Sequence, residues 1–111
     1  MNERNNQNQM LNSLRLTAQK VMPKGGKVFL YGSRAKGSAT EESDWDLLLL
    51  VDKQSLDEND FNDIAYPFVL TGWKSGADVS PQLYTYNEWK EREITPYYQN
   101  VEHDKIVIYE S

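Results

Sequence analysis

The residues of this chain best suited to bind a cation are two aspartates at the start of an apolar segment. Asp44 and Asp46 flank Trp45, and the uninterrupted apolar run 47–51 follows them. Because side chains alternate along a strand, the two carboxylates would project from one face and Trp45 from the other. Two carboxylates so close together repel each other unless a cation lies between them. The pair is therefore a candidate site for Mg²⁺, which takes carboxylate ligands together with the phosphates of a substrate.

A third carboxylate, Asp78, lies near the start of the next expected strand, which covers residues 76–80 and is limited by Pro81. From that position Asp78 could reach the pair across neighbouring strands. Three carboxylates on adjacent strands would form a two-metal site for phosphoryl transfer. An isolated Asp-x-Asp is nevertheless more often a solvated acidic strand end, because loops and strand ends are rich in aspartate. The carboxylates alone leave both interpretations open.

A glycine–serine turn ahead of the aspartates favours the metal-site interpretation. Gly32 and Ser33 follow a short apolar strand. A helix that begins at Ser33 would aim backbone N–H groups and a positive dipole end at an anion. The Ser33 hydroxyl adds a donor, and the positive charges of Arg34 and Lys36 could reach phosphate oxygens. Ser33 lies 11 residues before Asp44, so a phosphate site and a metal site would lie side by side.

The elements that must position these residues form one small domain of α+β type, a mixed sheet with helices packed on it. The run 45–51 is apolar on both faces, so we expect a central strand that is covered on both sides. Ser55 and Glu58 predict a capping box for a helix that Pro67 kinks or breaks and that Gly72 follows. Within the single domain, 1–111, we expect a frayed segment over 1–9, a helix over about 10–22, strands over 27–31, 45–51, 76–80 and 106–109, and short helices at 34–35, 87–93 and 96–101.

The charge of the chain is unevenly distributed. The 111 residues carry a net charge of -5. Residues 1–40 hold seven basic residues and one acidic residue, whereas residues 41–63 hold one basic residue and nine acidic ones. An acidic protein is a poor candidate for sequence-independent binding to nucleic acid, so we do not expect a nucleic acid partner. The basic segment instead ends at the predicted phosphate-binding turn, and the acidic segment contains the predicted metal ligands Asp44 and Asp46.

Several other classes of protein are excluded by composition and motif. The chain has no cysteine, which excludes disulfide scaffolds, thiolate zinc sites and cysteine nucleophiles. No apolar run approaches the roughly 18 residues of a membrane span, and residues 1–10 lack the apolar core of a signal peptide. We therefore expect a cytoplasmic protein without a membrane partner. The one histidine, His103, lies in a polar turn without a nucleophile elbow elsewhere, which argues against a serine hydrolase.

The segment Tyr-Gly-Ser-Arg-Ala-Lys-Gly at 31–37, followed by Ser-Asp-Trp-Asp-Leu at 43–47, resembles the signature of the nucleotidyltransferase superfamily related to DNA polymerase beta. The resemblance extends loosely from about residue 10 to residue 85. The short chain is similar to the minimal nucleotidyltransferases, which include antitoxins paired with helical HEPN-type toxins. This resemblance implies the nucleotidyltransferase fold and a partner protein, either a HEPN-type toxin or a subunit that presents the acceptor.

The resemblance also implies roles for particular residues. Gly32 and Ser33 would bind the triphosphate of ATP or another nucleoside triphosphate. Asp44 and Asp46 would hold two Mg²⁺ ions. Asp78 would be the third carboxylate, which ligates the metal near the acceptor hydroxyl and helps to deprotonate that hydroxyl. Order and strand context select Asp78 over Asp52 for this last role.

Two functions follow from the resemblance. The first is an Mg²⁺-dependent enzyme that moves a nucleoside monophosphate, AMP from ATP, to a hydroxyl and releases pyrophosphate. The second is a binding module that keeps the fold and masks a toxin without turnover. The chain has no room for the second domain with which larger relatives present the acceptor.

Aromatic residues are concentrated in the final third of the chain. Packing in the core or on the surface explains most clusters of this kind. An exposed patch that grips a protein partner is the functional alternative, and stacking on nucleobases is a third interpretation that the local acidity argues against. The residues concerned are Tyr84, Tyr86, Trp89, Tyr97 and Tyr98.

Overall fold

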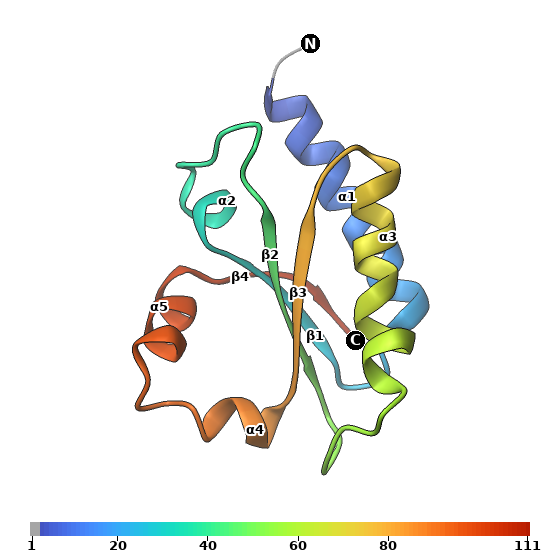
Figure 1. The fold of residues 1–111 in the computed structure, drawn as a ribbon, viewed down its shortest axis with the longest axis vertical. Helices are drawn as coiled ribbons and strands as arrows, with labels where there is room; N and C mark the ends of the chain where they lie inside the picture. The colour runs from blue at the N-terminus through green and yellow to red at the C-terminus, as the bar shows by residue number, and fades with distance from the viewer. Residues whose placement is uncertain (1–2) are drawn as a thin grey trace.

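The computed structural model describes the backbone of residues 3–111 and the side-chain surroundings of residues 7–111. It has a four-stranded sheet with helices on both faces (Figure 1). The α+β class expected from the sequence is confirmed. In chain order the elements are α1 (Glu3–Val21), β1 (Lys27–Tyr31), α2 (Ser33–Lys36), β2 (Trp45–Val51), the π-helical segment η1 (Phe61–Ala65), α3 (Tyr66–Lys74), β3 (Val79–Thr85), α4 (Tyr86–Lys90), α5 (Pro96–Asp104) and β4 (Ile106–Glu110).

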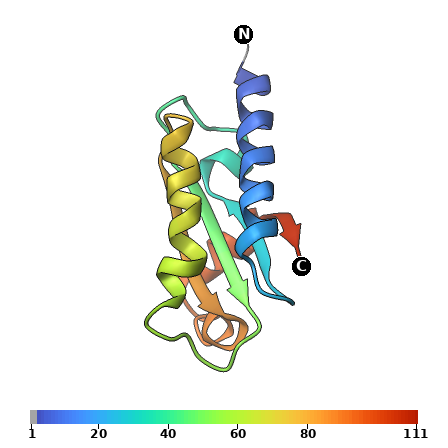
Figure 2. The same cartoon turned by 90° about the vertical axis from the view of Figure 1, so that its right-hand side faces the viewer.

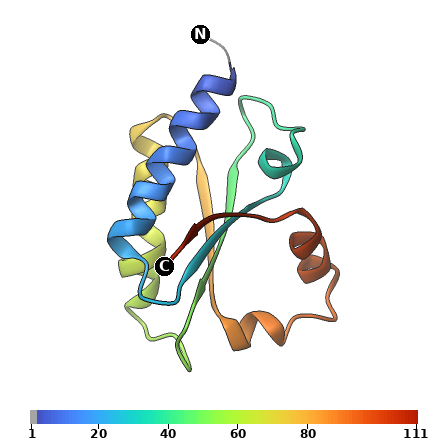
Figure 3. The same cartoon turned by 180° about the vertical axis from the view of Figure 1, so that it is seen from behind.

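The strand order is β3-β2-β1-β4, and the sheet is mixed. β1 pairs antiparallel with β2 and with β4, whereas β2 pairs parallel with β3. β2 is therefore an interior strand, as its unbroken apolar run predicts. The helices α1 and α3 lie side by side on one face of the sheet, and α4 and α5 lie on the other (Figures 2 and 3).

Each face of the sheet carries its own hydrophobic core. We call the face under α1 and α3 the apolar face, because aliphatic side chains dominate it. We call the opposite face, under α4 and α5, the aromatic face. The apolar face is built from residues that include Leu14, Ala18, Val28, Leu30, Leu47, Leu49, Val51 and Phe68. The aromatic face is built from Phe29, Leu48, Leu50, Trp89 and Val101, with Tyr31, Tyr84, Tyr86 and Tyr98 packed against them.

Two helix starts differ from the sequence predictions. α1 begins at Glu3 rather than near residue 10, so all but residues 1–2 of the segment expected to be frayed lie in this helix, and those two lie outside the described residues. The capping box predicted at Ser55 and Glu58 is wrong, because the helical segment starts near residue 60. The carboxylates of Asp57 and Asp60 instead accept hydrogen bonds from backbone amides in this segment. The Asn59 amide donates to Asp57 Oδ1 at 2.9 Å, and the Asp57 amide donates to Asp60 Oδ2 at 2.8 Å.

The helix around Pro67 continues farther than predicted. Pro67 lies in the first turn of α3, directly after the π-helical segment, so the backbone irregularity precedes the proline. Gly72 lies inside α3 and does not follow its end. A Cβ at Gly72 would lie 2.5 Å from Val79 Cγ2 and 2.9 Å from the carbonyl oxygen of Ala77. Gly72 therefore allows α3 to pack closely on β3, and Gly76, with φ +73°, forms the turn that follows.

β3 begins at Val79, three residues later than predicted, and continues through Pro81 to Thr85. Pro81 is tolerated because β3 is an edge strand, where a proline can face away from the ladder. The expected short helices α2, α4 and α5 and the edge strand β4 are present. None of the helices in residues 3–111 is both long enough and apolar enough to cross a membrane.

Candidate active site

The turn after β1 brings its backbone against the carboxylate of Asp46. Gly32 has φ +73° and ψ -156°, a conformation that is essentially restricted to glycine. A Cβ built at Gly32 would lie 2.6 Å from Asp46 Oδ2. The amides of Ala35 and Lys36 donate to the Gly32 carbonyl at 3.0 and 3.1 Å, so α2 starts directly at Ser33. The structure thus juxtaposes the glycine–serine turn and Asp46, as the sequence predicts.

Trp45 anchors the two aspartates in the sheet. Its side chain is buried on the apolar face, and its amide donates to the Asp78 carbonyl at 2.9 Å. Asp44 is exposed, whereas Asp46 is partly buried. Burial raises the pKa of Asp46 above its ordinary value, and the neighbouring charge of Asp44 raises it further. The charged form of Asp46 is therefore destabilised, and a bound cation would offset this destabilisation.

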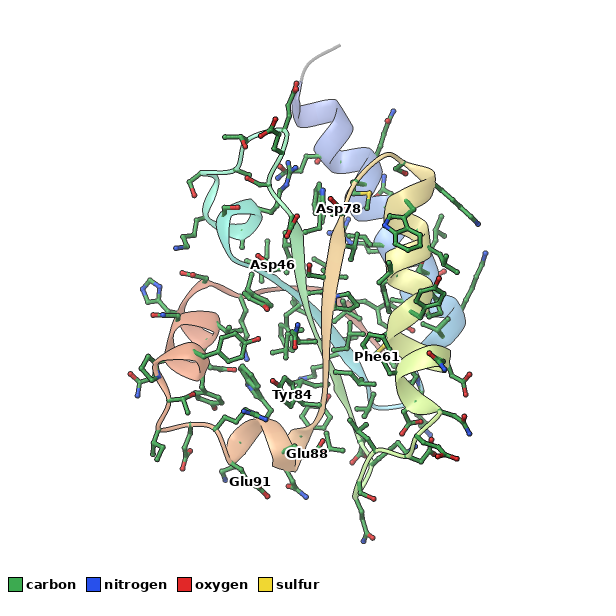
Figure 4. All side chains as sticks on the ribbon, viewed as in Figure 1. Asp46, Phe61, Asp78, Tyr84, Glu88 and Glu91 are labelled. Atoms are coloured by element: carbon green, nitrogen blue, oxygen red, sulfur yellow. The ribbon has the colours of Figure 1, made fainter. Side chains whose placement is uncertain are left out.

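Asp78 lies in the turn immediately before β3, and its side chain is exposed. Trp45 pairs with Val79 in the parallel ladder, so Asp78 is at the same end of the sheet as Asp44. Figure 4 shows Asp78 and Asp46 toward this end of neighbouring strands. Among the side chains of residues 7–111, however, no group of three or more histidines, aspartates or glutamates is arranged to hold a metal ion. The structure brings the strands together without assembling the predicted three-carboxylate cluster.

Arg34 has a role that the sequence did not indicate. Its guanidinium lies 4.6 Å from the centre of the Trp45 ring. One terminal nitrogen, Nη2, donates to the Ser43 carbonyl at 2.9 Å and to the Glu41 carbonyl at 3.4 Å. Arg34 thus connects α2 to the loop before β2 and packs against Trp45. These contacts are tertiary, so the sequence did not indicate them, and the phosphate-binding role expected of Arg34 stays a prediction.

Lys36 is the cation of α2 that remains at the surface. Its side chain is 56% exposed, and Nζ lies 3.5 Å from Asp104 Oδ2 at the end of α5. The pKa of Asp104 is lowered, first by a hydrogen bond with His103 and then by Lys36. His103 is exposed, as expected, but it lies in the last turn of α5 rather than in a loop. Lys36 therefore joins the end of α5 to the start of the predicted phosphate site.

A pair of tyrosines borders the carboxylates on the aromatic face, and sequence reasoning missed it. Tyr31 is the cross-strand partner of Asp46. The hydroxyls of Tyr31 and Tyr97 are 3.1 Å apart, and their rings meet edge to face. Burial and the hydrogen bond with Tyr97 raise the pKa of Tyr31. Each tyrosine comes from a different part of the chain, so no local motif could have indicated the pair.

The other aromatic residues of the final third support the packing interpretation. Trp89 is buried at the centre of the aromatic face, with its ring 4.8 Å from the ring of Tyr98 and 5.3 Å from that of Tyr84. Its indole N–H donates to Glu102 Oε2 at 2.8 Å. The cluster therefore holds α4 and α5 on the sheet.

A cavity of about 830 Å³ lies on the other side of Trp45, between α1, the loop before β2 and the turn before β3. Its lining includes Arg34 and Trp45 but none of Gly32, Ser33, Asp44 or Asp46. The carboxylates thus lie outside this cavity, next to the glycine–serine turn.

Comparisons with known proteins agree with this geometry. Residues 16–70 match the family model described as polymerase beta, nucleotidyltransferase. This segment includes the glycine–serine turn, Asp44 and Asp46, while Asp78 lies beyond it. No curated protein matches the sequence.

Two solved structures share the fold. One is a putative nucleotidyltransferase from Sulfolobus solfataricus, 22% identical, with a TM-score of 0.65 over 96% of this chain and 85% of that chain. The other is a toxin–antitoxin with AMP-PNP, 17% identical, with a TM-score of 0.63 over 91% of this chain and 73% of that chain. At these identities the two structures establish the fold alone. The match to the family model over residues 16–70, which contain the glycine–serine turn, Asp44 and Asp46, identifies the chain as a minimal member of the polymerase beta nucleotidyltransferase family.

Proposed function

We propose that this protein is an Mg²⁺-dependent nucleotidyltransferase that moves AMP from ATP to a hydroxyl group on a protein or small-molecule acceptor and releases pyrophosphate. The observation that carries the proposal is the contact between the glycine–serine turn and the aspartate pair. A Cβ at Gly32 would lie 2.6 Å from Asp46 Oδ2, so a phosphate on the turn would lie next to this carboxylate. Transfer of a phosphoryl group depends mainly on such positioning and on neutralisation of charge.

The donor set fits Mg²⁺. Asp44 and Asp46 provide hard oxygen ligands, and Mg²⁺ in proteins is commonly held by one or two carboxylates plus the phosphates of a substrate. The raised pKa of Asp46, caused by burial and by Asp44, indicates two negative charges that a cation would stabilise. When bound there, Mg²⁺ would supply neutralisation of the charge that develops on the phosphates. Asp78 is at the right end of the sheet to join these ligands if its exposed side chain turns toward them.

The triphosphate would lie on Gly32 and Ser33, with Lys36 as the nearby cation. In the Lys36–Asp104 ion pair, the Lys36 side chain is 56% exposed and the Asp104 side chain 14% exposed, and Nζ lies 3.5 Å from Oδ2. Because Lys36 itself is at the surface and this contact is long, Lys36 could exchange Asp104 for a phosphate oxygen. Arg34 contributes indirectly, because its hydrogen bond to the Ser43 carbonyl holds the loop that leads to Asp44.

A protein partner is part of the proposal. The toxin–antitoxin structure with AMP-PNP, which shares the fold, supports an adenine nucleotide and a protein partner. The sequence resemblance implies a HEPN-type toxin as that partner. A partner protein that presents the acceptor hydroxyl would complete the site. The alternative function, a binding module that masks its partner without turnover, is favoured by one observation: Asp78 is not assembled with the other carboxylates.

The test is a double substitution, Asp44→Asn together with Asp46→Asn. We expect it to abolish transfer of labelled AMP to the acceptor, because both predicted Mg²⁺ ligands lose their charge, while circular dichroism shows a retained fold. Asp52→Asn, at the opposite end of β2, is the control and should retain transfer. Full activity of the double variant would exclude the proposed site. Partner binding by a wild-type protein that transfers nothing would favour the binding module.

A further inference from the structure

The hydroxyl of Tyr97, on α5, lies at the border of the proposed active site. Tyr97 is the second residue of α5, and its side chain is 38% exposed. Its hydroxyl is 3.1 Å from the hydroxyl of Tyr31. On the other side, the ring of Tyr97 meets the ring of Trp89 edge to face at 5.8 Å. Two aromatic neighbours therefore hold the Tyr97 hydroxyl in one place while solvent still reaches it.

Tyr31 links this hydroxyl to the carboxylate. Tyr31 and Asp46 are directly opposite each other in the antiparallel pair β1–β2. Opposite residues project from the same face of a sheet, with Cβ atoms about 4.5–5.5 Å apart. Tyr31 also immediately precedes Gly32, the residue whose backbone touches Asp46. The Tyr97 hydroxyl is thus one side chain away from both the predicted phosphate turn and the predicted metal ligand.

We propose that Tyr97 is a self-modification site, to which the chain transfers a nucleoside monophosphate in cis. This inference rests on the proposed function and names one acceptor for it. Tyr97 Oη attacks the α-phosphorus of the nucleoside triphosphate and forms a phosphodiester bond to it. The bond between the α-phosphorus and the oxygen bridging to the β-phosphorus breaks, and pyrophosphate leaves with that electron pair. The phenolic proton passes to solvent, which reaches the hydroxyl because Tyr97 is exposed.

Other tyrosines of the aromatic face are less suitable acceptors. Tyr31 is more buried than Tyr97. The guanidinium of Arg92 lies 4.9 Å from the centre of the Tyr84 ring, and Tyr98 packs against Trp89. A tyrosine of similar exposure is available as a control. Tyr66, on α3, is 39% exposed and meets Trp73 edge to face, but it is on the opposite side of the sheet.

The experiment uses the full chain incubated with Mg²⁺ and each nucleoside triphosphate in turn, followed by intact-mass and peptide mass spectrometry. We expect one nucleoside monophosphate per chain, on the peptide that contains Tyr97. Tyr97→Phe should abolish the modification, because it removes only the attacking hydroxyl, and Tyr66→Phe should leave the modification unchanged. A label that persists in Tyr97→Phe, or that maps to another residue, would overturn the proposal.

A mixing experiment tests whether the transfer occurs in cis. The Asp44→Asn plus Asp46→Asn chain, which still has Tyr97, is mixed with the Tyr97→Phe chain, which still has both aspartates. Neither chain should become labelled, whereas labelling of the first chain would show transfer between chains and would overturn the proposal that the transfer is confined to one chain.

One assay distinguishes failure of the self-modification proposal from failure of the proposed nucleotidyltransferase function. Tyr97→Phe and wild type are both supplied with a lysate or a co-purified partner and labelled triphosphate. Transfer to an outside acceptor without any label on Tyr97 would overturn the self-modification site and leave the nucleotidyltransferase intact. Absence of transfer to any acceptor would overturn both. Label on Tyr97 in wild type, together with outside transfer by Tyr97→Phe, would support both.

Discussion

The two faces of the sheet are built from alternate residues of the same strands, yet they have different tasks. On the apolar face, β2 contributes Leu47, Leu49 and Val51, which are fully buried under α1 and α3. On the aromatic face, β2 contributes Leu48 and Leu50, but the residue before them in the same alternation is Asp46. The residues that β2 places on the apolar face are all apolar. On the aromatic face, the same strand begins with the polar Asp46 and continues with the apolar Leu48 and Leu50.

The difference shows how a short chain accommodates both a core and a site. Because a strand alternates, a single run of seven residues can stabilise the fold on one face and carry a carboxylate on the other. The aromatic face still needs packing, which Trp89 provides from α4 with a hydrogen bond to Glu102 of α5. Substitutions on the apolar face should therefore change the free energy of unfolding, and substitutions near Asp46 should change transfer.

The largest effect on stability is expected for Phe68→Ala on the apolar face. Phe68 is fully buried in α3, and removal of a buried phenylalanine side chain costs about 3–5 kcal/mol. Urea denaturation measures the loss, and the transfer activity of the protein that remains folded should be unchanged. Leu16→Ala, on the same side but 58% exposed, is the control and should cost less than about 0.5 kcal/mol. Loss of specific activity in folded Phe68→Ala would contradict the division between the faces.

The next effect is expected for Gly32→Ala at the border of the two regions. The conformation of Gly32 strains any residue with a Cβ by about 1–3 kcal/mol. The new Cβ would also displace the Asp46 carboxylate, since it would lie 2.6 Å from Oδ2. A displaced catalytic group of this kind lowers the rate about 100-fold, as measured by single-turnover transfer.

Gly76→Ala separates the two causes. Gly76 has the same φ of +73°, but a Cβ there would meet nothing within 4 Å. This variant should lose about 1–2 kcal/mol of stability and retain its transfer rate. If both variants lost activity equally, backbone strain rather than displacement of Asp46 would be the cause.

The sequence was most informative where local pattern and tertiary environment agree. The apolar runs of β1 and β2 predicted both strands and the interior position of β2, and Gly32 with Ser33 predicted the turn beside the carboxylates. The capping box predicted at Ser55 and Glu58 was wrong, and the carboxylates of Asp57 and Asp60 accept backbone hydrogen bonds before the helical segment instead. A residue outside the local pattern also contributes, because Lys53 donates to Asp60 Oδ2 at 2.7 Å.

The residues that were missed depend on contacts between distant segments. Arg34 has acceptors only because the loop 41–43 folds back over α2. Tyr97 borders the site only because α5 lies on the aromatic face, 66 residues after Tyr31. All of the assigned metal-ligand and phosphate-binding roles stay predictions, since they depend on groups that bind to the chain. They concern Asp44, Asp46 and Asp78 for the metal, and Gly32, Ser33, Arg34 and Lys36 for the phosphates.

The smallest effect is expected for Asp46→Asn in the absence of Mg²⁺, and it should be a gain in stability. Burial and the charge of Asp44 raise the folded-state pKa of Asp46 above its unfolded value of 3.8. The folded state therefore binds the Asp46 proton more tightly than the unfolded state does. The stability contributed by this proton is fully present below the unfolded pKa and is lost as the pH rises through the folded pKa.

Asparagine does not ionise, so the variant avoids this loss. Urea midpoints should be higher for Asp46→Asn than for wild type at pH 7, and the difference should be smaller at pH 4. Adding Mg²⁺ should raise the midpoint of wild type and not that of Asp46→Asn, because only the charged pair binds the cation in the folded state. If wild type were more stable than Asp46→Asn at pH 7 without Mg²⁺, the fold itself would stabilise the Asp46 carboxylate. The contrast between a stabilising apolar face and a functional aromatic face would then not hold for Asp46, the residue on which it mainly depends.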